Sequence, residues 1–270
     1  MGLLYSLVLD LIAQQDAVLP PTQGHHAHAF LLALIREIDA DLSARLHAPG
    51  AKPFTASSLL RGPTRGPAGW QVREGARYAL RFTALDEALF AKFLGSLLGS
   101  QAPDLRLGTA HFAIATVHTQ PATSSWARVA SFDQLIDAAS ADASLALEFC
   151  SPTAFQLTGN HSLLFPDPAL VFGSLAARWN AFAPAKIDRA VVDQIAAAAL
   201  VSRYRLETSM FDFGRYRKVG FVGHCHYQLR AAGSEVVQAA NTLAAFAFFA
   251  GVGYKTTMGM GQARKLQNRT

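Results

Sequence analysis

Apolar and polar residues recur with two different spacings along the first 120 residues of the chain. The segment LLYSLVLDL (3–11) has the pattern of a buried strand, whereas AHAFLLALIREI (27–38) places apolar residues three and four positions apart and predicts a helix. Asp39 is expected to be the N-cap of a further short helix, DADLSARLH (39–47). Strands are then predicted in KPFTASSL (52–59), WQVREGARYALRFTAL (70–85) and DLRLGTAHFAIATVHT (104–119), and an amphipathic helix in DEALFAKFLGSLLG (86–99).

The second half of the chain repeats this succession after the segment TQPATSSWA (119–127), whose proline and small polar residues indicate a linker. Strands are predicted in ASLALEFCSP (143–152), ALVSRYRLETSMFDF (199–213), KVGFVGHCHYQLRA (218–231) and MGQARKL (260–266). Helices are predicted in DPALVFGSLAARWNAFA (167–183) and in SEVVQAANTLAAFAFFA (234–250), with Ser234 as the cap of the second.

The order of the predicted elements is β-α-β-β-α-β in each half, which is the ferredoxin-like arrangement. The sequence therefore predicts an α+β protein of two tandem ferredoxin-like (RRM-like) domains, each with an antiparallel sheet. The boundary falls in the linker, which gives an N-terminal domain of residues 1–120 and a C-terminal domain of residues 121–270.

Composition favours a folded, intracellular protein. Apolar residues make up 51% of the chain and charged residues 16%, so a large core is available. The two cysteines, Cys150 and Cys225, are too few for a disulfide framework and are expected to be reduced thiols. No segment approaches the ~20 consecutive apolar residues that a membrane-spanning helix needs. We therefore expect a cytoplasmic location and no membrane association.

The net charge of +5 is unevenly distributed. From residue 201 onward there are ten Lys and Arg residues and three Asp and Glu residues, a net charge of +7, while the remaining 14 basic and 16 acidic residues give −2. Clustered positive charge is expected where a protein binds a polyanion such as RNA, although a solvated basic surface has the same composition.

The segment GVGYKTTMGMGQAR (251–264) follows a nearly continuous apolar helix pattern. Its four glycines allow positive φ angles and the close approach of another chain. Successive exposed N–H groups in such a loop can bind an anion, and one lysine and two threonines add donors. The segment is not a P-loop, because Tyr254 rather than a glycine precedes the lysine and because the loop follows a helix.

The glycine spacing, G-V-G, five residues, then G-M-G, resembles the glycine-rich signature of the RAMP superfamily of CRISPR-associated proteins. Within that superfamily, the chain is similar to the standalone endoribonucleases that cut CRISPR precursor RNA at its repeats. An L-H pair (46–47) before K-P-F-T-x-S (52–57) is similar to the segment that follows the first helix in that family. SPTAF, LFP and WNAF in the second half are similar to its C-terminal domain.

The resemblance implies a metal-independent endoribonuclease that needs no cofactor. In such enzymes the ribose 2′-OH attacks the neighbouring scissile phosphate, which leaves 2′,3′-cyclic phosphate and 5′-OH ends, and the protein supplies proton transfer, alignment and charge stabilisation. His47 matches the family's histidine and is expected to be a general acid or base, and Lys52 matches the lysine that stabilises developing charge. Some members place a catalytic tyrosine on the first helix, near Ile35 or Arg36 of this chain, so that Arg36 or another donor would substitute for it.

Other histidines leave alternatives open. The histidines of the cluster GHHAHAF (24–30), which are His25, His26 and His28, are rivals of His47, and the same cluster could be a metal site or an exposed helix start. No cysteine or nearby acidic residue completes a metal set there, so no metal site is predicted. His224 and His226 lie on one face of their strand, where they could bind a metal, contact RNA or simply form part of the sheet.

RNA is expected to lie against the second domain and to cross toward the first. The residues expected to contact it in the glycine-rich segment are Gly251, Gly253, Tyr254, Lys255, Thr256, Thr257, Gly259, Gly261 and Arg264, and those outside it are Arg203, Arg205, Arg215, Arg217 and Lys218. The implied partners are CRISPR repeat RNA and a CRISPR effector complex, with the protein as a monomer or a homodimer.

Two hypotheses from other classes remain. One is a non-catalytic RNA-binding RAMP subunit of a CRISPR effector complex, which would share the fold and the glycine-rich segment but lack competent chemistry. The other is a tandem ferredoxin-like protein that binds a small molecule. Specific cutting of repeat RNA in EDTA distinguishes the endoribonuclease from both.

Overall fold

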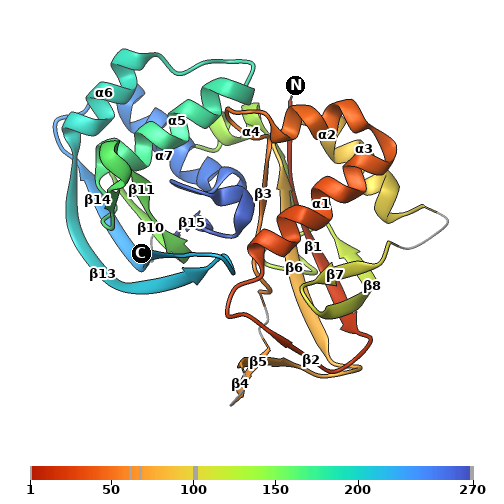
Figure 1. Cartoon of the computed structure of the whole chain (residues 1–270). Coiled ribbons are helices and arrows are strands. Elements are labelled where there is room, and N and C mark those ends of the chain that lie inside the picture. Colours follow the sequence, from red (N-terminus) through yellow and green to blue (C-terminus); the bar gives the residue numbers. More distant parts are fainter. Residues whose placement is uncertain (1, 61–62, 67–68, 100–102, 268–270) are drawn as a thin grey trace.

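The computed structural model describes residues 2–60, 63–66, 69–99 and 103–267, and its two halves lie side by side (Figure 1). The elements of the first half are β1 (Leu3–Ala13), β2 (Ala17–Leu19), α1 (Gly24–Ile38), α2 (Ala40–His47), β3 (Phe54–Ala56), β4 (Thr64–Gly66), β5 (Gly69–Val72), β6 (Arg77–Ala84), α3 (Glu87–Leu97), β7 (Leu105–Leu107) and β8 (Ala110–His118). Those of the second half are β9 (Arg128–Ser131), α4 (Phe132–Asp137), β10 (Ser144–Thr153), β11 (Phe155–Gln156), η1 (Thr158–Asn160), β12 (Ser162–Leu163), α5 (Pro168–Phe182), α6 (Arg189–Ala198), β13 (Ala199–Asp212), β14 (Arg217–Leu229), α7 (Ser234–Ala250), η2 (Thr256–Met258) and β15 (Ala263–Lys265).

The first sheet has the strand order β3-β6-β1-β8-β7, and neighbouring strands are antiparallel. β1 is central because it is apolar on both faces: Leu7 and Leu9 join the core under the helices, while Val8 joins a smaller cluster on the opposite face. The predicted strand 104–119 is in fact a hairpin of β7 and β8, because Gly108 adopts a φ of 63° and turns the chain. A small sheet, β2-β5-β4, was not predicted.

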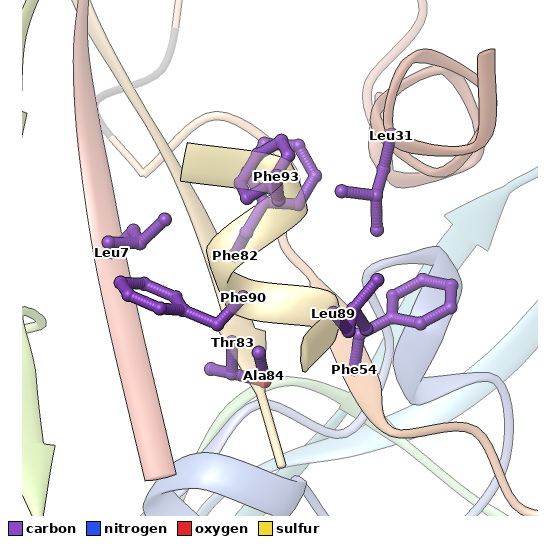
Figure 2. Close-up of a pocket in the computed structure, with 9 residues that line it drawn as sticks. All are labelled: Leu7, Leu31, Phe54, Phe82, Thr83, Ala84, Leu89, Phe90 and Phe93. Carbon is purple, nitrogen blue, oxygen red and sulfur yellow. The ribbon is translucent and has the colours of Figure 1, made fainter. Parts of the chain in front are cut away.

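Helices α1 and α3 cover one face of the first sheet. Figure 2 shows Leu31 of α1 and Phe93 of α3 with Leu7 and Phe82 of the sheet, around a cavity of ≈ 10 Å³. A space of this size holds about one water molecule at most, so it is a packing gap and not a ligand site. The predicted cap of α2 is confirmed, because the carboxylate of Asp39 accepts a hydrogen bond from the Leu42 N–H at 2.7 Å.

The second sheet has the order β13-β14-β10-β15, again antiparallel, with α5 and α7 packed on it. Two details differ from the prediction. Helix α6 was not predicted, since its buried apolar face consists only of Val192 and Ile195. Helix α7 begins at Ser234 with Gly233 as the N-cap, and no side chain caps it, so Ser234 is not the cap.

Two features join the halves. After β8 the chain returns to the first sheet, where β9 pairs with β1, and α4 then packs on α7. On β6, the side chain of Arg81 is only 1% exposed and crosses to the second half. Its guanidinium donates hydrogen bonds to the side-chain oxygen of Gln262 and to the carbonyl of Phe248. These bonds hold the end of α7 and the segment after it against the first sheet.

Both halves are therefore mixed α and β structure with antiparallel sheets, which confirms the predicted class at this level. Within the described ranges, no helix is long and apolar enough to cross a membrane.

Candidate functional site

The glycine-rich loop, residues 251–264, connects α7 to β15 and folds back on itself. It begins at Gly251, with a φ of 66°, and Lys255 adopts a left-handed conformation (φ 53°, ψ 37°) just before η2. The Val252 N–H donates to the Gly261 carbonyl at 2.8 Å. A Cβ atom on Gly261 would lie 2.1 Å from the Val252 carbonyl oxygen, so the glycine is needed to close the loop.

Helix α1 begins directly against this loop. A Cβ atom on Gly24 would lie 2.1 Å from the Met258 carbonyl oxygen, so the two segments touch through backbone. One turn further along α1, the imidazole of His28 makes a hydrogen bond from Nδ1 to the Thr257 carbonyl at 3.2 Å. Because a carbonyl can only accept, the proton lies on Nδ1 and Nε2 is the basic nitrogen of neutral His28.

We expect Gly24→Ala to lower the melting temperature, because the new methyl group would push η2 away from α1. An alanine inside a helix normally stabilises it by up to about 1 kcal/mol relative to glycine. The control is Gly95→Ala in α3, where a Cβ atom meets nothing within 4 Å, so that this variant should be as stable as wild type or slightly more so. Equal melting temperatures for both variants would contradict the close contact.

His47 lies at the end of α2, exposed to solvent. Its Nδ1 donates to the Ser43 carbonyl at 2.8 Å, so its Nε2 is also the basic nitrogen in the neutral form. The ammonium of Lys52 donates to the Ala48 carbonyl in the same connection.

The structure brings the sequence-predicted catalytic residues of the first half close to the loop of the second half. Burial lowers the pKa of the His28 imidazole below its ordinary value, and three neighbouring positive charges lower it further, against an opposing effect of its backbone hydrogen bond. Those neighbours are His47, Lys52 and Lys255. Two imidazoles and two lysines are thus close enough to interact electrostatically at this junction of the two halves.

Arg36 and the other histidines of α1 are placed differently. Arg36 is exposed in the last turn of α1, two turns beyond His28, and its side chain has no hydrogen bond or ion pair among the described residues. The rings of His25 and His26 lie in contact, with centroids 3.9 Å apart and planes tilted by 39°. In the part of the chain that the structure describes, no group of three or more His, Cys, Asp or Glu side chains could hold a metal ion.

The predicted RNA-binding arginines of the second sheet differ in their surroundings. Arg203 and Arg205 are exposed on the edge strand β13, opposite His226 and His224. Arg264, in contrast, forms an ion pair with Glu148 at 2.5 Å, and its guanidinium lies 5.0 Å from the centre of the Trp126 ring.

Although burial alone would raise the pKa of the Glu148 carboxyl, the hydrogen bond and charge of Arg264, with His224, hold it below its ordinary value. The carboxylate is therefore ionised at neutral pH and offsets the charge of Arg264. From the sequence alone, Arg264 was expected to be a cation available to RNA.

The turn between β13 and β14 carries the remaining predicted cations. Arg217 pairs with Asp212 at 3.0 Å, while Arg215 is exposed and Lys218 is half-buried. This turn lies against the glycine-rich loop, because the ammonium of Lys255 donates to the hydroxyl of Tyr216.

Sequence reasoning missed the residues that hold the loop in place. Arg81 and Gln262 form one of the hydrogen bonds between the halves, and the ring of Phe213 packs against the ammonium of Lys255. A single arginine inside the apolar strand pattern YALRFTAL was the available signal for Arg81, since an unpaired charge in a buried strand needs partners.

Comparisons with known proteins agree along nearly the whole chain. The family model of the CRISPR Cas6 N-terminal domain matches residues 3–137, and that of the CRISPR-associated endoribonuclease Cas6 matches residues 147–263. The Cas6 endoribonuclease of Mycobacterium tuberculosis is 26% identical over 262 residues, which cover 96% of this chain and 76% of that protein. The Streptococcus thermophilus Cas6 endoribonuclease is 31% identical over 124 residues, 45% of this chain and 49% of that protein.

Solved structures give the same result. A Cas6 product complex superposes with a TM-score of 0.85 at 28% identity, covering 98% of this chain and 100% of that one. Thermus thermophilus Cas6 has a TM-score of 0.75 at 28% identity, covering 98% of this chain and 99% of that one. Together with the matched domain models, these similarities show that the chain belongs to the Cas6 family of CRISPR-associated endoribonucleases.

Proposed function

We propose that this protein is a metal-independent endoribonuclease that cuts CRISPR precursor RNA within its repeats by attack of the ribose 2′-OH. The observation that carries the proposal is the meeting of two imidazoles, His28 and His47, with two lysines beside the glycine-rich loop. The names of the relatives, and the product and substrate-mimic complexes among the structural neighbours, support RNA cleavage at repeats.

The chemistry needs one group to accept a proton and another to donate one. Nε2 of His28 takes the proton of the 2′-OH, since its lowered pKa keeps this imidazole neutral at neutral pH. The 2′ oxygen forms a bond to phosphorus, and the bond to the 5′ oxygen breaks. Protonated His47 gives its Nε2 proton to the leaving 5′ oxygen, which yields the 5′-OH and the 2′,3′-cyclic phosphate. Lys52 stabilises the negative charge that develops on the phosphate oxygens.

Product analysis tests this reaction. Repeat RNA incubated with the protein in EDTA should yield fragments that end in 2′,3′-cyclic phosphate and begin with 5′-OH. Tight binding without cutting would instead support the alternative, a non-catalytic RNA-binding subunit of a CRISPR effector complex. That alternative is favoured by one observation: Arg36, near the position of the catalytic tyrosine of some family members, is exposed two turns beyond His28 and makes no hydrogen bond among the described residues.

We also propose that the RNA backbone lies on the glycine-rich loop and on the basic residues of β13 and the turn after it. The Thr257 N–H, at the start of η2, has no backbone hydrogen-bond partner in the described part of the chain and is half-buried, so it is available to a phosphate, whereas Thr256 is buried. Arg203, Arg205 and Arg215 add exposed positive charge. Of the remaining predicted contacts in the loop, Gly253 and Tyr254 are half-buried and belong to the same surface, whereas Gly251, Gly259 and Gly261 are buried.

Binding of repeat RNA should weaken about 100-fold between 50 and 200 mM salt, as expected for about five phosphate contacts. Arg203→Ala or Arg205→Ala should reduce the slope of log affinity against log salt by about 0.7 each. Filter binding measures both. The control is Arg189→Ala, because Arg189 is exposed on α6 and is paired with Asp193. An affinity that does not depend on salt would contradict the proposed surface.

The two halves are proposed to be ferredoxin-like domains with a boundary at residue 120. The strand orders β3-β6-β1-β8 and β13-β14-β10-β15 support this, since each follows the chain order second, third, first, fourth. In this description, β9 belongs to the second domain and reaches back to pair with β1 of the first.

A further inference from the structure

The ammonium of Lys255 lies among three aromatic rings. Its Nζ is 4.7 Å from the ring centre of Phe213, 4.8 Å from that of Tyr216 and 5.4 Å from that of Tyr254. These distances are within the range of cation–π attraction, and the Tyr216 hydroxyl accepts a hydrogen bond from the same ammonium. We call these three side chains the aromatic cage.

The aromatic cage is built on rigid structure. Phe213 and Tyr216 stack with ring centroids 4.9 Å apart and planes 21° apart, and the Phe213 N–H donates to the Tyr216 carbonyl at 2.9 Å. Phe213 is buried in a small core with Phe211 and Met260, and Met260 belongs to the glycine-rich loop. The cage therefore fixes the turn between β13 and β14 to the loop, and fixes the position of the charge between them.

Lys255 differs from two other cations near the loop, Arg264 and Arg217, in having no acidic partner among the described residues. Arg264 is paired with Glu148, and Arg217 is paired with Asp212. Among the described residues, no carboxylate lies within ion-pair distance of Lys255. Aromatic faces hold an ammonium without neutralising it, and an ammonium has three N–H donors. Lys255 therefore keeps its full charge for an anion.

The charge of Lys255 acts on the imidazole of His28, and the backbone of the same loop touches that imidazole. Lys255 is the N-cap of η2, and the Thr257 carbonyl, two residues further, accepts the hydrogen bond from His28. Three basic residues act on the pKa of His28: His47 and Lys52 from the first half and Lys255 from the second. Basic side chains from both halves of the chain would therefore interact with an anion bound beside His28.

We propose that Lys255 is a second cationic catalytic residue, which stabilises charge developing on the scissile phosphate, and that Phe213, Tyr216 and Tyr254 are positioning residues that hold its ammonium in place. This inference rests on the proposed endoribonuclease function. It adds that the second half of the chain supplies a catalytic charge, while the first half supplies the histidines.

The test compares Lys255→Met with wild type in single-turnover cleavage at saturating repeat RNA, together with the dissociation constant. Removal of one preorganised stabilising group typically lowers the rate by about 10²–10³-fold, and we expect a loss in that range with less than about a tenfold change in affinity. Lys255→Arg keeps the charge and should recover part of the rate. Lys186→Met is the control, since Lys186 is exposed in the connection between α5 and α6.

A pH profile separates this role from a structural one. The charge of Lys255 lowers the pKa of His28, as do those of His47 and Lys52. Its removal should raise that pKa, so that the rise in rate with pH occurs at higher pH in Lys255→Met than in wild type. Tyr216→Phe, which keeps the ring, should cost about twofold, and Tyr216→Ala about fivefold, in the same rate.

Wild-type rates for Lys255→Met at saturating RNA would overturn the inference while leaving the endoribonuclease intact. A defect that disappears once RNA is saturating would also overturn it, since Lys255 would then contribute binding alone. Wild-type protein that binds repeat RNA without cutting it would contradict the proposed function itself, and this inference with it.

Discussion

Replacement of either His28 or His47 by alanine should reduce the single-turnover rate of repeat cleavage by about 10²–10⁴-fold, the usual contribution of a general acid or base. Each variant loses one of the two basic Nε2 atoms that lie near the glycine-rich loop. If the two imidazoles act in one step, the double variant should lose little more than the worse single variant. The rate is measured at saturating RNA, in EDTA.

Repeat affinity should change little in these variants, since proton transfer contributes to the reaction and not to RNA binding. His161→Ala is the matched control, because His161 is exposed near the β11–β12 hairpin and has no side-chain hydrogen bond among the described residues. If His47→Ala loses activity and His28→Ala keeps it, then neither proton transfer depends on His28. Full activity in both alanine variants would contradict the proposed site.

Arg81→Leu should lower the free energy of unfolding by about 2–5 kcal/mol, which is among the largest effects of a single substitution. The variant would leave the carbonyl of Phe248 and the side-chain oxygen of Gln262 buried without their donor. It would also remove the guanidinium that lies 4.7 Å from the Trp126 ring centre and 4.5 Å from that of Phe248. Thermal unfolding should show a fall in melting temperature of about 5–10 °C.

The control is Arg77→Leu, because Arg77 lies on the same strand, β6, and is exposed. Burial lowers the pKa of the Arg81 guanidinium to about 9, so it remains charged at neutral pH and its network is intact there. Equal melting temperatures of the two leucine variants would contradict the role of Arg81 in joining the halves.

Local features of the fold were predictable from the sequence because they depend on neighbouring residues. The cap of α2 by Asp39 follows from residues three positions apart. The long strands β13 and β14 and the helix α7 follow from apolar spacing that one segment contains by itself. The interruption between β7 and β8 is also local, but the single glycine of that segment, Gly108, does not by itself distinguish a turn from a continuous strand.

The availability of a charge was not predictable in the same way, because it depends on contacts between distant segments. Arg264 stands beside Glu148 only through the antiparallel register of β15 on β10. Lys255 is surrounded by rings that are about 40 residues away in sequence or next to it, and the stacking of Phe213 on Tyr216 depends on the turn geometry. The sequence supplied the residue types but not their pairing.

The relation between His28 and His47 also depends on contacts between distant segments and could not be predicted from the sequence. The sequence placed them as rivals, because 19 positions separate them and the path of the connection between α2 and β3 is not encoded in any short pattern. In the structure both have Nδ1 bonded to a backbone carbonyl, and the charge of one acts on the other. Two residues that were alternatives therefore become partners in the proposed reaction.

The most direct test of the account is the structure of the protein bound to its repeat RNA with a 2′-deoxyribose at the scissile nucleotide, which removes the nucleophile and prevents cutting. The account predicts that the scissile phosphate lies between α1 and the glycine-rich loop, with Nε2 of His28 and of His47 within about 3.2 Å of the 2′ position and of the leaving oxygen. A scissile phosphate bound elsewhere, out of reach of both imidazoles, would contradict it.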